Sequence, residues 1–330
     1  MAKSLTAMLS RGFTAVALAV TALTTLSGQQ PIPSAASLAQ PYHLVEGWAK
    51  MPAGRNWGAP AAVEIDPDGK SLWVFERCGK NTCADSALAP VLKFDAAGNL
   101  VKSFGGGQFL FPHGLAVDKD GNLWLADGQG ANGKGHQVFK YSSDGKLLLT
   151  LGKAGVAGEG SDTFNMPADV AVAPNGDVFI SDGHNPLETN MRIMKFSKTG
   201  TFIKSWGKKG SAPGELSDPH SIAFDSKGRL FVADRGNDRI QIFDQDGKVI
   251  DIWKQFGKPS GLFVSKDDTL YVADQQAGIR IGSAVDGSVK AIIPAPAGAT
   301  RVAESVTVDA AGNVYGGENG AMKLMKYVKN

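Results

Sequence analysis

Two histidines and one glutamate occupy the same position in three of six copies of a short repeated phrase. The six copies are Pro60-Ala61-Ala62-Val63, Pro112-His113-Gly114-Leu115, Pro167-Ala168-Asp169-Val170, Pro219-His220-Ser221-Ile222, Pro259-Ser260-Gly261-Leu262 and Ala303-Glu304-Ser305-Val306. The second position of the phrase, which we call the slot, therefore reads Ala, His, Ala, His, Ser and Glu. Only copies two, four and six carry an imidazole or a carboxylate at the slot.

The phasing of these three side chains predicts a metal centre. Repeats of similar length stack as equivalent units, so the slots should lie at equivalent heights around one axis, and alternate copies point inward about a third of a turn apart. We therefore expect His113, His220 and Glu304 to converge on one point. Two imidazoles and a carboxylate are a known ligand set of catalytic zinc, and the same set also suits Fe²⁺.

The residues after each copy predict four short antiparallel strands. In copy two, β-rich runs at 115–117 and 123–125 flank the turn Asp118-Lys119-Asp120-Gly121, which has glycine where a positive φ is needed. Third and fourth runs follow at 137–141 and 147–151. Four such strands make a propeller blade, so we predict one all-β, six-bladed propeller over residues 40–330. A strand near Tyr42 would complete the last blade and close the ring.

Composition and charge narrow the classes of function. The chain of 330 residues is 43% hydrophobic and 20% charged, which is typical of a folded soluble domain. A formal net charge of +2 without a basic stripe argues against nucleic acid as a partner. We expect a monomer that takes a small molecule or a peptide into its central channel.

The first residues predict export from the cytoplasm. Lys3 and Arg11 precede the apolar run 12–20, and small and polar residues follow, as in a cleaved secretory signal. The run is short for a membrane span, so a retained anchor is the weaker alternative. We assign residues 1–39 to a signal peptide and leader, and expect a secreted or periplasmic protein without a membrane contact after cleavage. An exported chain permits Cys78 and Cys83, its two cysteines, to pair across one loop.

The wording of the repeat resembles the NHL-repeat family of six-bladed propellers. The run from Tyr42 to the end is more narrowly similar to peptidyl-α-hydroxyglycine α-amidating lyases. The segments that carry this resemblance are Tyr42-His43-Leu44-Val45, Phe75-Glu76-Arg77, Phe111-Pro112-His113-Gly114-Leu115, Pro167-Ala168-Asp169-Val170-Ala171-Val172, Ser181-Asp182-Gly183, Pro219-His220-Ser221 and Val232-Ala233-Asp234-Arg235.

The resemblance implies a zinc ion in the channel with His113 and His220 as two of its three ligands. In the family the third ligand is also a histidine, followed by an aspartate that helps to bind a structural calcium ion. This chain has Glu304 and Ser305 at these positions. Glutamate is an acceptable zinc ligand. Ser305 cannot supply negative charge, which leaves the calcium site in doubt, although the carbonyl oxygens of Val63 and Leu115 are available to an ion.

The resemblance also implies a reaction, which cleaves the N–Cα bond of a C-terminal α-hydroxyglycine and releases a peptide amide and glyoxylate. Arg77 and Arg235 match the cationic positions, and a guanidinium suits a substrate carboxylate. The tyrosine that the family uses as a base aligns with His184, and a histidine can transfer protons near neutral pH. We therefore expect His184, Arg77 and Arg235 to act in catalysis.

Two other functions are compatible with the sequence. A propeller hydrolase could use a channel metal to polarise the carbonyl of a lactone or ester. A non-catalytic NHL propeller could bind a peptide or glycan across its loop face, because fold does not fix function. Each residue also has a structural alternative: a histidine packed in the core, a solvent-facing Glu304, or an inter-blade ion pair at Arg77 or Arg235.

Overall fold

The computed structural model describes Met1 and residues 30–184, 190–296 and 303–330. Most of the expected signal peptide and leader, residues 1–39, lies outside the described residues. Strands dominate the described part, which contains two short 3₁₀ helices, η1 (Ala35–Ser37) and η2 (Arg235–Asn237). None of its helices is long and apolar enough to cross a lipid bilayer.

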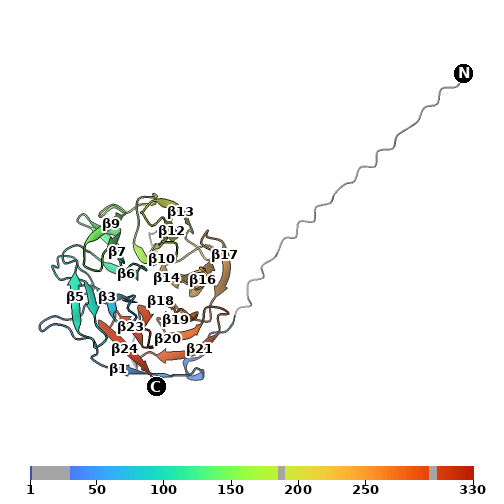
Figure 1. The fold of residues 1–330 in the computed structure, drawn as a ribbon. Helices are drawn as coiled ribbons and strands as arrows, with labels where there is room; N and C mark the ends of the chain where they lie inside the picture. The colour runs from blue at the N-terminus through green and yellow to red at the C-terminus, as the bar shows by residue number, and fades with distance from the viewer. Residues whose placement is uncertain (2–29, 185–189, 297–302) are drawn as a thin grey trace.

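Six sheets of four antiparallel strands form a ring, as the sequence predicts (Figure 1). Strands of the first three blades are β2 (Pro60–Ile65), β3 (Leu72–Glu76), β4 (Val91–Phe94), β5 (Leu100–Phe104), β6 (Pro112–Val117), β7 (Leu123–Ala131), β8 (Lys134–Tyr141), β9 (Leu147–Leu151), β10 (Pro167–Val172), β11 (Val178–Asp182), β12 (Arg192–Phe196) and β13 (Phe202–Trp206). Strands of blades four and five are β14 (Pro219–Phe224), β15 (Leu230–Asp234), β16 (Arg239–Phe243), β17 (Val249–Trp253), β18 (Pro259–Val264), β19 (Thr269–Asp274), β20 (Gly278–Ser283) and β21 (Val289–Pro294).

The sixth blade joins the two ends of the propeller. It combines β22 (Ser305–Val308), β23 (Val314–Glu318) and β24 (Lys323–Lys329) with β1 (Tyr42–Val45) from the start of the domain. Tyr42 pairs with Lys329, and Val45 pairs with Lys326. The predicted closing strand is therefore confirmed, and it supplies the fourth, outermost strand of the last blade.

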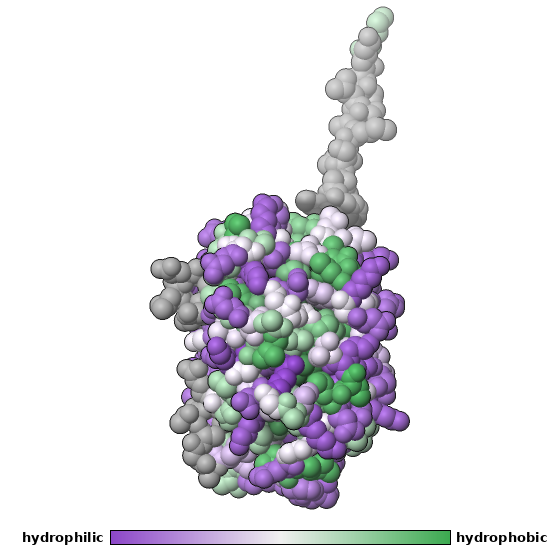
Figure 2. Space-filling model, turned by 90° about the vertical axis from the view of Figure 1, so that its left-hand side faces the viewer, coloured by the Kyte–Doolittle hydropathy of each residue, from purple (hydrophilic) through white to green (hydrophobic). Residues whose placement is uncertain are grey.

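Apolar side chains fill the spaces between neighbouring blades. Between blades one and two, for example, Trp73 and Phe75 pack with Phe109, Leu115 and Leu125, all of them buried. A blade cannot cover both of its faces by itself, so this packing around the ring supplies the core. On the outer side shown in Figure 2, hydrophilic and hydrophobic residues are interspersed.

A buried aspartate in the second strand of four blades anchors the segment that leads to the slot. Asp127, for example, accepts hydrogen bonds from the backbone N–H groups of Leu110 and Phe111, and Asp234 accepts one from Ser217. Asp182 and Asp274 bind the corresponding segments of their own blades. These aspartates have a structural role, because they bind the backbone that leads to the slot residues.

The slot itself is a β-bulge. Pro219 pairs with Asp234 and Ser221 pairs with Ala233, which leaves His220 as an extra residue in the inner strand. The same irregularity occurs at the slots of the other four blades that begin with proline. A bulge redirects a side chain. Here it turns the slot residues toward the channel at one end of the inner strands.

Candidate metal centre

His113 and His220 are buried residues of the channel lining, on inner strands β6 and β14. The Nδ1 atom of His113 is 2.7 Å from the carbonyl oxygen of Ala168, and that of His220 is 2.8 Å from the carbonyl oxygen of Ser260. A carbonyl can only accept, so each Nδ1 carries the proton and donates it. Each Nε2 atom is left with a free lone pair, which is the state of a metal-binding imidazole.

His184 joins these two histidines. It follows β11, and its backbone N–H donates to the carbonyl oxygen of Met166 over 3.0 Å. The ring centroids of His113 and His184 are 4.4 Å apart, and each lies within 4.9 Å of the His220 centroid. One ring nitrogen from each of the three histidines lies within 4.8 Å of the other two. The predicted proton-transfer residue is thus placed with the predicted ligands.

Asp218 fixes the orientation of His184 and was not singled out by the sequence. Its Oδ1 atom is 3.1 Å from Nδ1 of His184, and its Oδ2 atom accepts a 2.7 Å hydrogen bond from Nε of Arg235. Nη2 of Arg235 is also 3.3 Å from Nδ1 of His184. A carboxylate only accepts, so Nδ1 of His184 must donate to Asp218, and the approach of Arg235 to that nitrogen is not a hydrogen bond. His184 is therefore left with a free lone pair on Nε2, as the other two histidines are.

Glu304 lies beside His220. Its Oε1 atom is 3.0 Å from Nε2 of His220 and 3.6 Å from Nη1 of Arg235. The contact with His220 lacks the geometry of a hydrogen bond, and Nε2 of His113 and of His220 has no hydrogen-bond partner in the described structure. A lone pair that faces a carboxylate oxygen is unfavourable unless a cation or a proton neutralises it. A cation bound at Nε2 of His220 would neutralise this close approach of Nε2 to Oε1 of Glu304.

The charge states also suit metal binding. Burial, together with the neighbouring His184 and His220, lowers the pKa of His113 well below its usual range. Burial lowers the pKa of His184 as well, although Asp218 opposes the shift. Burial opposes the ionisation of Glu304, but His220 and Arg235 outweigh it and hold the pKa of that carboxyl well below its usual range. At neutral pH the site thus offers neutral imidazoles at His113 and His184 and an ionised carboxylate at Glu304.

The two predicted arginines lie beside residues of the site but differ in their partners. Arg235 is paired with Asp218 and lies close to Glu304. The guanidinium of Arg77 donates to the carbonyl oxygen of Pro112 and lies 3.7 Å from the ring centroid of Phe111. Burial is the main reason that the pKa of Arg77 falls to about 10, so it remains a cation at neutral pH. Arg77 has no carboxylate in ion-pair contact among the described residues.

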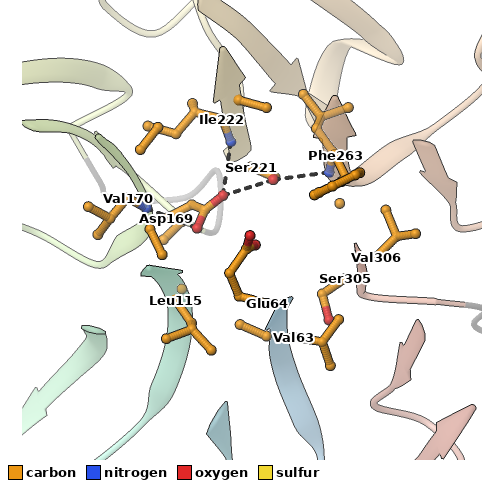
Figure 3. A pocket seen from close by; sticks show the side chains of 18 of the residues that line it. Val63, Glu64, Leu115, Asp169, Val170, Ser221, Ile222, Phe263, Ser305 and Val306 are labelled. Carbon is orange, nitrogen blue, oxygen red and sulfur yellow. Dashed lines mark hydrogen bonds between the residues drawn. The ribbon is translucent and has the colours of Figure 1, made fainter. Parts of the chain in front are cut away.

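The channel continues past the histidines as a cavity of about 240 Å³. Figure 3 shows the carboxyl group of Glu64 pointing into this cavity between Asp169 and Ser305. Asp169 accepts hydrogen bonds from the hydroxyl of Ser221 and the N–H of Ile222. Burial, and then the charge of Asp169, raises the pKa of Glu64 to about 8. Burial raises the pKa of Asp169 to about 6. The channel therefore holds one carboxyl group, that of Glu64, that the repeat pattern did not reveal, beside Asp169, whose place after the slot of the third copy suggests a channel-facing side chain.

Comparisons with known proteins place this geometry in a family. The NHL repeat matches residues 109–141, 164–196 and 216–243. Human NHL repeat-containing protein 3 is 31% identical over 310 residues, which cover 87% of this chain and 84% of the human protein. A closed six-bladed propeller with a polar channel site is thus the class of protein that fold and site define. The chain belongs to the NHL-repeat family of β-propellers.

Amidating enzymes match this chain at higher sequence identity than NHL repeat-containing protein 3 does, but over fewer residues. The rat peptidylglycine α-amidating monooxygenase is 42% identical over 187 residues, which are 54% of this chain and 18% of the rat protein. Peptidyl-α-hydroxyglycine α-amidating lyase 1 of Drosophila melanogaster is 38% identical over 160 residues, covering 45% of this chain and 28% of that protein. The chain thus spans less than a third of the length of these relatives.

A solved structure of another activity shares the fold. A gluconolactonase from Xanthomonas campestris has a TM-score of 0.63 at 20% identity, with 92% of this chain and 96% of that chain covered. At this identity the similarity concerns the propeller architecture.

Proposed function

We propose that this propeller is a zinc-dependent lyase that converts a peptide ending in α-hydroxyglycine into a peptide amide and glyoxylate. The observation that carries the proposal is the convergence of three imidazole nitrogens next to Arg77, an arginine that has no carboxylate partner among the described residues. Similarity to amidating lyases supports the choice of reaction. The products balance the substrate, because the N–Cα bond breaks, the hydroxyl proton leaves, and the amide nitrogen gains a proton.

His113, His220 and His184 would hold the zinc ion, and this assignment revises the ligand set expected from the sequence. Three imidazoles that donate through Nδ1 and leave Nε2 free are a usual catalytic zinc set. When bound, zinc supplies Lewis acidity toward the substrate hydroxyl. The positions are exchanged relative to the amidating lyases that the sequence resembles: His184 takes the place of their tyrosine, and Glu304 takes the place of their third histidine.

Glu304 would then accept the hydroxyl proton and pass it to the amide nitrogen. It is ionised at neutral pH and lies 3.0 Å from a ligand nitrogen, which is within reach of a group bound at the same centre. His184 is poorly suited to this task, because its Nδ1 proton is committed to Asp218. Arg235 stabilises the ionised forms of Asp218 and Glu304.

Arg77 would bind the carboxylate of the hydroxyglycine. It is a buried cation without a carboxylate partner in the described structure, and a guanidinium binds a carboxylate with two parallel hydrogen bonds. The two arginines therefore have separate roles, with Arg77 facing the substrate and Arg235 holding the site together.

A second cation could bind deeper in the channel. Ser305 brings no charge, but Glu64 points its carboxyl group into the same cavity (Figure 3). We propose that Glu64, with the carbonyl oxygens of Val63 and Leu115, would hold the calcium ion that the resemblance implies, because hard cations prefer oxygen ligands. Export is also part of the proposal, since the Cys78–Cys83 disulfide suits an oxidising compartment.

Glyoxylate release tests the proposed function. Mature protein, loaded with one equivalent of zinc, is incubated with a peptide that ends in α-hydroxyglycine, and glyoxylate and the peptide amide are measured in equal amounts. The chelator-treated protein and the His113→Ala/His220→Ala variant are the controls and should be inactive. Activity on lactones with none on the hydroxyglycine peptide would refute the proposal, and so would lyase activity that survives complete removal of metal.

A further inference from the structure

The guanidinium of Arg77 is bonded to the loop between Cys78 and Cys83, which has no part in the proposed reaction steps. Arg77 directly follows β3, and its Nη1 donates a 2.7 Å hydrogen bond to the Oδ1 atom of Asn81. Its Nε donates a 2.9 Å hydrogen bond to the carbonyl oxygen of Pro112, the residue before His113. In the described part of the chain, no hydrogen bond involves Nη2. Two of the three guanidinium nitrogens are thus bonded to protein, and the N–H groups of Nη2 remain available to a ligand.

A disulfide closes the loop that carries Asn81. Cys78 and Cys83 are bonded, with their Cα atoms 5.1 Å apart, and both are buried. Cys78 has a φ of 53°, in the left-handed region that side chains other than glycine rarely adopt. At its far end the loop bonds to the next blade, because the N–H of Cys83 and the hydroxyl of Thr82 both donate to the carbonyl oxygen of Leu110.

Asn81 depends on this closure to hold Arg77. The residue is exposed, so water competes for its amide group, and an isolated hydrogen bond of this kind fixes a long side chain only weakly. If the loop is closed and tied to Leu110, Asn81 is held next to the guanidinium in advance. Fixing a binding group before the ligand arrives lowers the entropic cost of binding.

We infer that the Cys78–Cys83 loop, through Asn81, positions Arg77 for the carboxylate of an anionic substrate. This inference rests on the proposed function for the identity of the substrate. It makes Asn81 and the disulfide positioning elements that act on substrate affinity rather than on the metal. Loss of either should raise KM for the hydroxyglycine peptide about tenfold, the effect of one charge-assisted hydrogen bond, and leave kcat and zinc content within twofold.

Two variants and two readouts test the inference. Asn81→Ala removes the contact and keeps the disulfide, whereas Cys78→Ser/Cys83→Ser opens the loop and keeps Asn81. Lys80→Gln is the matched control, because this exposed side chain lies in the same loop and makes no side-chain hydrogen bond or ion pair in the described structure. Steady-state kinetics give kcat and KM. Mass spectrometry of phenylglyoxal-treated protein gives the labelling rate of Arg77, which does not depend on lyase activity.

The expected result is a higher KM and faster labelling of Arg77 in both variants, with the control unchanged. Unchanged KM and labelling in both variants would overturn the inference. A loss of zinc with a fall in kcat at constant KM would also overturn it, because the loop would then act on the metal centre. If the wild-type chain releases no glyoxylate, the proposed function fails, and the labelling rates alone still decide whether the loop positions Arg77.

Discussion

Replacing Asp218 with asparagine should weaken zinc binding without unfolding the propeller. Both carboxylate oxygens of Asp218 are used, at 3.1 Å from Nδ1 of His184 and at 2.7 Å from Nε of Arg235. Asparagine offers one acceptor and one donor, so one of these two donors loses its partner. The carboxyl is ionised under all ordinary conditions, because the hydrogen bond from His184 and the charges of His220 and Arg235 outweigh burial and keep its pKa low.

The magnitude follows from the kind of contact that is lost. Removing the group that orients a metal-binding imidazole typically weakens metal affinity about 10- to 100-fold. This range corresponds to about 1.4 to 2.7 kcal/mol, which agrees with the contribution of one hydrogen bond to a charged group. We therefore expect the Kd of zinc in Asp218→Asn to rise about 10- to 100-fold.

Chelator competition measures this Kd, with Asp225→Asn as the matched control. Asp225 is buried and accepts a 2.6 Å hydrogen bond from Nε of Arg229, so it has the same type of partner. It follows β14 at the end opposite His220, and its loss should lower the melting temperature and leave the zinc Kd within twofold. A zinc Kd in Asp218→Asn within twofold of wild type would refute the reasoning, as would equal weakening in both variants.

Three further predictions concern the ligands, the arginines and the channel. At zinc concentrations that saturate the wild type, His184→Ala should bind no zinc, whereas Glu304→Gln should keep zinc and lose at least about 100-fold in kcat, as expected for a proton-transfer residue. Metal analysis and kinetics check both variants. Zinc loss in Glu304→Gln with zinc retained in His184→Ala would return Glu304 to the ligand set. Arg77→Met should mainly raise KM for the hydroxyglycine peptide, whereas Arg235→Met should also lower thermal stability and zinc content. Identical effects of the two variants on KM and zinc content would contradict the separate roles of the two arginines. In the folded state Glu64 keeps its proton up to a pKa of about 8, against an ordinary value of 4.5, so the folded state loses stability as pH rises across this range, by up to about 1.4 kcal/mol per pH unit. Without metal, Glu64→Gln should therefore have a higher melting temperature than wild type at pH 8 and nearly the same one at pH 5, and calcium should stabilise only the wild type. Equal melting temperatures at both pH values would contradict the raised pKa.

The repeat pattern was sufficient to predict the fold. Six copies of one phrase, the turn signals between them and a spare strand near Tyr42 gave six blades and their closure, all of which the structure confirms. Repetition is informative here because each blade obeys the same packing rules as its neighbours. The pairing of Cys78 with Cys83 was also predicted, and the structure contains this disulfide.

The site was only partly predictable from the repeat pattern, because His184 and Asp218 do not occupy the slot of any copy. His113 and His220 were visible through their phase, but the bulge that turns them into the channel leaves no sequence signal. His184 lies on a loop after β11, so its approach to the other histidines depends on tertiary structure. Asp218 precedes Pro219 with a φ of 58°, and this turn of the backbone accompanies the contact with His184. An aspartate directly before a Pro-His phrase was the one sequence signal that could have suggested its role.

X-ray absorption at the zinc edge tests the central claim most directly. The zinc-loaded wild-type protein should show three imidazole ligands, and zinc-loaded His184→Ala, prepared at high zinc concentration, should show two. Glu304→Gln should retain the wild-type spectrum. Two imidazoles and a carboxylate in the wild type, with no change in His184→Ala, would contradict the proposed set of His113, His220 and His184.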